Sequence, residues 1–191
     1  MSDLLKQIHA NHTAALDGMF RDCSESIVQM AKWSADALAA GKKLLFCGNG
    51  GSACDAMHIA GEFVGRFVDD RKGLPAIALS ADTGIITAIA NDYNYDYVFA
   101  RQVEALGQQG DVLISLSTSG KSPNVLRAMA AAKAQGMKTV LLTGLKAKDL
   151  PPAADLTIMV PSLITAHVQE GHATALHAMA SLIEAQLFPK V

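Results

Sequence analysis

Aromatic residues and charges are scarce in this sequence of 191 residues. Aromatic residues make up 5% of the chain and charged residues 18%, whereas 50% of all residues are hydrophobic. A chain so apolar and so weakly charged is not typical of a disordered protein. Because the apolar residues are mainly aliphatic, we expect helices that pack on a parallel sheet buried on both faces.

Long apolar runs and an excess of one charge are also absent. The formal net charge is −2, so we expect neither nucleic acid nor an anionic membrane surface as a partner. The most apolar stretch, residues 112–116, is too short to cross a membrane. The first residues lack the apolar segment and cleavage site of a secretory signal. Together these features predict a cytoplasmic protein.

Cysteine is rare as well. Cys23, Cys47 and Cys54 form neither the even framework of a secreted protein nor a CxxC pair, and we expect three reduced thiols. Cys47 and Cys54 flank a glycine-rich loop, which leaves redox sensitivity open for these two residues.

The length predicts a single domain, in which residues 1–40 form an N-terminal helical arm and residues 42–191 form an α/β core. Along the arm, apolar residues recur at intervals of three and four. This pattern predicts two helices before the first strand, and Gly41 is expected to end the second.

Short apolar runs alternate with helix-like segments in the rest of the chain. Five runs have the length of strands, at residues 43–47, 76–79, 111–116, 139–143 and 156–160. Helical patterns follow them, at residues 53–67, 81–90, 123–135 and 165–187. Since strands joined by helices form a parallel sheet covered on both faces, the sequence predicts a three-layer α/β/α sandwich of about five parallel strands.

Three polar loops follow strands or helices at the edge of the sheet where ligands bind, at residues 48–52, 91–92 and 117–122. The loop at residues 117–122 has four hydroxyl side chains and a glycine ahead of a helix that starts with Pro123. Such a helix start favours an anion, and the spacing matches neither a P-loop nor a dinucleotide motif. A phosphomonoester is therefore the expected ligand, and simple helix capping by the hydroxyls is the alternative.

Imidazole and carboxylate side chains gather on two of the predicted helices. His58 and Glu62 are four residues apart and share one helix face. The closing helix carries five further candidate ligands: His167, Gln169, Glu170, His172 and His177. Two of these five, with His58 and Glu62, would provide the nitrogen and oxygen ligands of a zinc site, unless His58 and Glu62 are simply a solvated or hydrogen-bonded pair. Gln169 and His177 are about 80° apart around the helix and roughly 12 Å apart along it, so both reach one ion only by leaning toward it.

A carboxylate and an imidazole beside a phosphate site suit an aldose–ketose isomerase. Such an enzyme needs a base for the proton next to the carbonyl and an acid for the oxygen, and Glu62 and His177 are the candidates. A bound metal could polarise the hydroxy-carbonyl unit. Of the remaining histidines, His172 is expected to be internal and hydrogen-bonded, and His9 and His12 to lie on the surface.

These motifs resemble the phosphoheptose isomerase family of the sugar isomerase (SIS) domain superfamily. The resemblance covers about residues 42–187, and it rests on residues 46–52, 56–67, 74–79, 88–92, 99–103, 110–113, 117–120 and 168–177. It implies one SIS domain of flavodoxin-like fold over residues 1–191. It also implies a cytoplasmic homotetramer that interconverts sedoheptulose 7-phosphate and D-glycero-D-manno-heptose 7-phosphate, the first step toward heptose for lipopolysaccharide or capsule.

The resemblance also implies roles for individual residues. His58, Glu62, Gln169 and His177 would bind one zinc ion per subunit, with Glu62 as the base and His177 as the acid. The implied substrate contacts are Asn49, Gly50, Gly51, Glu62, Asn91, Asp92, Ser117, Thr118, Ser119, Ser122 and Gln169.

The chain departs from the family pattern at three places. Lys121 stands where many members have Asn, and it could contact phosphate or be solvated; His167 stands where relatives often have Arg; and residues 145–148 replace a glycine-rich context. One rival is a non-catalytic SIS tetramer that binds a bacterial replication initiator, but such proteins lack counterparts of Glu62 and His177. A second rival, a phosphosugar-sensing regulator, would usually carry a DNA-binding segment that these N-terminal residues do not resemble.

Overall fold

A five-stranded parallel sheet forms the centre of the computed structural model, which describes residues 2–189. The strands lie in the order β2-β1-β3-β4-β5, with β1 Leu44–Gly48, β2 Ala76–Ala78, β3 Val112–Ser117, β4 Lys138–Gly144 and β5 Leu156–Val160. The chain leaves β1 toward one edge of the sheet and builds the other side from β3 onward. This order places a topological switch point between β1 and β3, where Gly48 is paired with Leu116.

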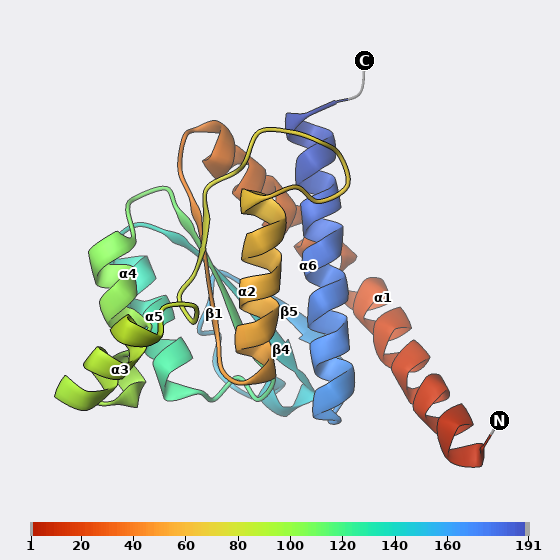
Figure 1. The fold of residues 1–191 in the computed structure, drawn as a ribbon. Coiled ribbons are helices and arrows are strands. Elements are labelled where there is room, and N and C mark those ends of the chain that lie inside the picture. Colours follow the sequence, from red (N-terminus) through yellow and green to blue (C-terminus); the bar gives the residue numbers. More distant parts are fainter. Residues whose placement is uncertain (1, 190–191) are drawn as a thin grey trace.

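Helices cover both faces of the sheet (Figure 1). On one face lie α1 Asp3–Ala39, α2 Gly51–Val64 and α6 Thr165–Leu187, and on the other lie α3 Thr83–Asp92, α4 Ala100–Leu106 and α5 Pro123–Ala134. Successive side chains of a strand point to opposite faces, so Phe46 joins the first core and Leu45 the second. The predicted three-layer α/β/α sandwich with five parallel strands is confirmed.

The prediction of two helices before β1 is wrong, because α1 is one continuous helix of 37 residues. The apolar stripe runs without a break from Ala15 to Leu38, and no proline interrupts it. Gly18 lies within this helix, where Pro161 packs so closely that a Cβ at position 18 would lie 2.6 Å from Pro161 Cγ. Only glycine fits there without a shift of Pro161. The first turns of α1 extend beyond the body of the molecule, with Leu4 exposed (Figure 1).

Other elements shift or were missed. The segment expected at 53–67 is helical over Gly51–Val64, whereas the closing helix has the predicted bounds. The helix α4 and two short 3₁₀ helices, η1 Tyr95–Tyr97 and η2 Leu145–Ala147, were not predicted. No helix within residues 2–189 is long and apolar enough to cross a membrane.

Candidate active site

The turn after β1 is tied to the start of α5 by a pair of amide side chains. Asn49 Nδ2 donates to Asn124 Oδ1 at 2.9 Å, and Asn124 Nδ2 donates to Asn49 Oδ1 at 2.8 Å. The hydroxyl of Tyr95 also donates to Asn49 Oδ1, at 3.1 Å. Gly50 follows with φ of 57°, a left-handed conformation that glycine adopts without steric cost. The glycine turn at residues 48–52 and the start of α5, which follows the loop at residues 117–122, are thus held side by side at the switch point.

The hydroxyls of the loop after β3 do not cap α5. Ser122 occupies the N-cap position, yet its side chain makes no capping hydrogen bond and lies 3.1 Å from Ser117 Oγ instead. Ser119 Oγ accepts a hydrogen bond from the Lys121 backbone N–H at 3.2 Å, across a turn in which Gly120 has φ of 67°. The capping alternative is therefore wrong for Ser122, and the helix start suits an anion.

His58, Glu62 and His177 meet between α2 and α6, which lie side by side (Figure 1). The Nε2 atoms of His58 and His177 are 2.9 Å apart, and Glu62 Oε1 lies 3.6 Å from His58 Nε2. Phe67 stacks on the His177 ring with centroids 5.6 Å apart. Glu62 and His177 are half-buried, so the cluster combines partial shielding with access from solvent.

The donor set of this cluster fits a zinc ion. One ligand atom from each of His58, Glu62 and His177 lies within 4.8 Å of the others, and two imidazoles with a carboxylate are common zinc ligands. Gln169 lies against Gly51 at the start of α2, so closely that a Cβ at position 51 would overlap its amide. Gln169 thus faces the glycine turn, while the other three expected ligands gather further along the two helices.

Asn91 and Asp92 lie at the end of α3, where both are exposed. Asn91 Nδ2 donates to Asp92 Oδ1 at 2.9 Å. Within residues 2–189, no hydrogen bond or ion pair joins them to the glycine turn or to the loop at residues 117–122.

Sequence reasoning missed Asp55, Asn124 and Tyr95. Asp55 precedes His58 by three residues on α2, and partial burial raises the pKa of its carboxyl above the usual range, while the nearby His58 opposes that rise. Its Oδ2 has no hydrogen-bond partner within the described chain. The spacing of three residues from His58 on one helix was the available signal, because it places both side chains on one face.

Cys47 lies inside the second core, and burial raises the pKa of its thiol to about 12. A thiol that stays protonated is a poor nucleophile, so redox sensitivity of Cys47 is not supported. Cys54 is exposed, and all three cysteines are free.

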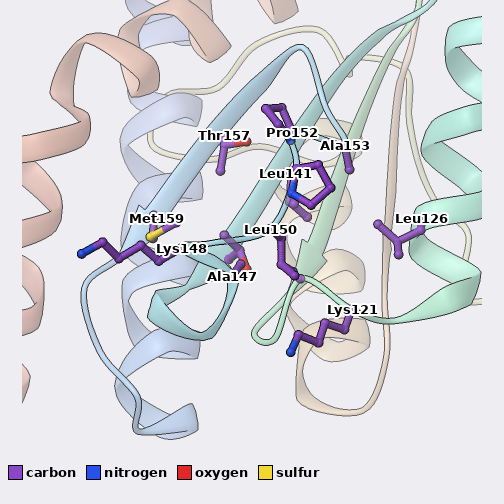
Figure 2. Close-up of a pocket in the computed structure, with 13 residues that line it drawn as sticks. Lys121, Leu126, Leu141, Ala147, Lys148, Leu150, Pro152, Ala153, Thr157 and Met159 are labelled. Carbon is purple, nitrogen blue, oxygen red and sulfur yellow. The ribbon is translucent and has the colours of Figure 1, made fainter.

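A cavity of about 480 Å³ lies beside the loop at residues 117–122, between the β4–β5 edge and residues 145–153 (Figure 2). Its lining is mostly apolar, with Leu141 and Leu150 among the lining residues and Lys121 and Lys148 as the charged ones. Lys121 is exposed. The segment at 145–148 that departs from the family pattern forms part of the cavity wall through Ala147 and Lys148.

His172 is buried as expected, but neither ring nitrogen has a hydrogen-bond partner within the described chain. Burial lowers its pKa to about 4, and the nearby Thr143 backbone opposes this only in part. The unfolded chain takes up the proton near the ordinary pKa of 6.5. The stability that depends on the neutral ring is therefore complete above about pH 6.5 and is lost as the pH falls toward 4.

We expect wild-type protein to lose about 2 kcal/mol of unfolding free energy between pH 7 and pH 5 through this group alone. Urea unfolding at both pH values, at one chain concentration, should show that the free energy of unfolding of His172→Gln falls less between pH 7 and pH 5 than that of wild type. The exposed His9, changed to Gln, is the control and should retain the full wild-type difference. Equal pH dependence in His172→Gln and wild type would contradict the assignment.

Comparison with known proteins gives matches along the whole chain. The family model of the SIS domain matches residues 9–144. A phosphoheptose isomerase of Geobacter sulfurreducens is 46% identical over 189 residues, which cover 99% of this chain and 100% of that protein. A phosphoheptose isomerase from Burkholderia pseudomallei (strain K96243) is 52% identical over 170 residues, which cover 87% of this chain and 86% of that protein. The structure of the phosphoheptose isomerase GmhA from Neisseria gonorrhoeae matches with a TM-score of 0.87 at 40% identity, over 96% of this chain and 98% of that chain.

Proposed function

Because the chain belongs to the SIS domain family and, within it, to the phosphoheptose isomerases, we propose that it interconverts sedoheptulose 7-phosphate and D-glycero-D-manno-heptose 7-phosphate. The observation that carries this proposal is the contact between α2 and α6, which joins Glu62 and His177 through His58. Proteins of the non-catalytic rival class lack counterparts of Glu62 and His177, and this chain has both.

The phosphate is proposed to bind at the start of α5. The unused capping position of Ser122 and the hydroxyl cluster around Ser117 support this, because they offer donors to phosphate oxygens beside a helix N-terminus. The proposed substrate contacts are Asn49, Gly50, Gly51, Glu62, Asn91, Asp92, Ser117, Thr118, Ser119, Ser122 and Gln169.

In the proposed reaction, Glu62 removes a proton from C1 of the ketose while His177 donates a proton to the carbonyl oxygen on C2, which forms an enediol. Glu62 then returns its proton to C2, and His177 takes the proton of the C1 hydroxyl to leave the aldehyde. One zinc ion per subunit, bound by His58, Glu62, Gln169 and His177, would polarise the hydroxy-carbonyl unit as a Lewis acid.

The active unit is proposed to be a cytoplasmic homotetramer whose product leads to heptose for lipopolysaccharide or capsule. The exposed apolar side chains near the start of α1 support an interface role, since they extend past the body of this subunit. These are Leu4, Leu5 and Ile8.

A direct test is an assay of the purified protein with sedoheptulose 7-phosphate, with and without added zinc. We expect turnover to an aldose that is higher with zinc, and none with a ketose that lacks the phosphate. No turnover under either condition, together with tight binding to a replication initiator, would favour the non-catalytic rival.

A further inference from the structure

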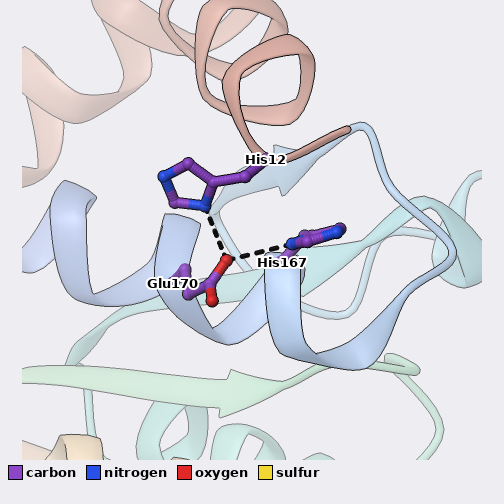
Figure 3. A group of neighbouring side chains, drawn as sticks. All are labelled: His12, His167 and Glu170. Carbon is purple, nitrogen blue, oxygen red and sulfur yellow. Dashed lines mark hydrogen bonds and ion pairs between the residues drawn. The ribbon is translucent and has the colours of Figure 1, made fainter. Parts of the chain in front are cut away.

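A second group of imidazole and carboxylate side chains joins the arm to the closing helix. His12 lies on α1, and His167 and Glu170 lie on the first turns of α6. His12 and Glu170 are 158 residues apart in the sequence. The Nδ1 atoms of His12 and His167 lie 2.6 and 3.0 Å from the same oxygen, Oε2 of Glu170 (Figure 3). His12 was expected to be a solvated surface residue, but its ring lies against this carboxylate instead.

We propose that His12, His167 and Glu170 form a second zinc site, separate from the cluster at His58. One ligand atom from each residue lies within 4.8 Å of the others. Two imidazoles and a carboxylate form a nitrogen and oxygen ligand set that suits zinc, whereas magnesium and calcium prefer oxygen ligands. The site would bind through Nδ1 of both histidines and Oε2 of Glu170.

The two contacts of Glu170 Oε2 with the imidazole Nδ1 atoms require only a small adjustment to admit the ion. With metal bonds of about 2.1 Å and tetrahedral angles, ligand atoms stand about 3.4 Å apart. The carboxylate oxygen of Glu170 must therefore retreat from each ring by less than about 1 Å. The Glu170 side chain is 47% exposed, so no packed neighbour holds it in place on its solvent side.

The three ligand side chains differ in solvent exposure, so an ion bound between them would be accessible to solvent from one side. The His167 side chain is 7% exposed and gives the site a fixed inner wall, whereas His12 is 36% exposed and opens toward solvent. A water molecule can occupy the fourth position from that open side, as it does in zinc sites with three protein ligands. The same side provides the route by which the ion enters.

A bound ion would join the arm to the part of α6 that faces the glycine turn. Before Ala15 no residue of α1 is buried, so the first turns of α1 have little packing of their own to hold them. The ligands His167 and Glu170 flank Gln169, which packs against Gly51. Zinc at this site would therefore act as a cross-link between α1 and α6 and would stabilise the arm by mass action.

The test counts zinc ions per chain in the purified, chelator-stripped protein after equilibrium dialysis against micromolar zinc. We expect His12→Gln to bind one equivalent fewer than wild type. The control is His9→Gln, on the same helix three residues earlier and exposed, which should bind as many ions as wild type. His167→Gln removes a ligand from the other helix and should lose the same single equivalent as His12→Gln.

The same experiment separates this site from the proposed catalytic one. His58→Gln should still bind the zinc ion that depends on His12. If the proposed site at His58 binds no zinc, the total number of zinc ions per chain is lower, but the ion that depends on His12 is still bound. Thermal unfolding gives a second measurement, in which zinc should raise the Tm of His12→Gln less than that of His9→Gln. Equal zinc content in wild type and His12→Gln, with circular dichroism showing both folded, would overturn the proposal and leave the trio as a hydrogen-bonded group.

Discussion

Glu62→Gln should lower kcat for sedoheptulose 7-phosphate by about 10³-fold, because it removes the proposed base that takes the proton from C1. The substitution keeps the size of the side chain and an oxygen atom that can bind zinc. Sugar-phosphate affinity, measured by calorimetry, should change little, since the phosphate is proposed to bind at the loop before α5. Zinc content should be measured in parallel, so that loss of the base is distinguished from loss of the metal.

Proton exchange gives a more direct measurement of the same step. In deuterated water the wild-type enzyme should exchange the C1 proton of the ketose with solvent, and Glu62→Gln should not, even after long incubation. Glu25→Gln, an exposed glutamate on α1, is the matched control and should exchange at the wild-type rate. Exchange by Glu62→Gln within a few-fold of wild type would exclude Glu62 as the base.

Features with a local pattern could be predicted from the sequence. The strands β3, β4 and β5 are short apolar runs that lie within one or two residues of their predicted positions, and α6 has its predicted bounds. The spacing of His58 and Glu62 placed them on one helix face before their partner on α6 was visible. Periodicity therefore predicts the fold class and the shared helix face of His58 and Glu62 in the proposed acid–base cluster.

Features that depend on distant parts of the chain could not be predicted. The amide pair of Asn49 and Asn124 joins residues 75 positions apart, and no local pattern marks it. Pro161 packs against Gly18 of α1 although the two residues lie far apart in the sequence, and no local pattern marks this contact. The position of Gln169 at the glycine turn likewise follows from how α2 and α6 are placed side by side, which only the packed core determines.

A buried ion pair connects the chain after α2 to the end of α6 and supports the position of the proposed base. Arg71 Nε donates to Glu184 Oε1 at 2.8 Å, and the two side chains are 2% and 7% exposed. The same guanidinium donates to the backbone carbonyls of Glu62 and Phe63, both at 2.8 Å. Arg71 therefore joins the last turn of α2, which carries Glu62, to the C-terminal part of α6.

Arg71→Met should lower the free energy of unfolding by about 3–5 kcal/mol, because it leaves the Glu184 carboxylate buried without its partner. Urea unfolding at one chain concentration measures this loss. Arg101→Met is the matched control: Arg101 pairs with Glu104 at the surface, both about half exposed, and its loss should cost less than about 1 kcal/mol.

The double variant Arg71→Met with Glu184→Leu distinguishes an unpaired charge from lost packing. If the unpaired carboxylate causes the loss, removing it as well should recover part of the stability, so the double variant should be more stable than Arg71→Met alone. The backbone carbonyls of Glu62 and Phe63 still lack their donor in the double variant, so recovery should be incomplete. A loss in Arg71→Met no larger than that in Arg101→Met would show that this pair does not hold α2 in place.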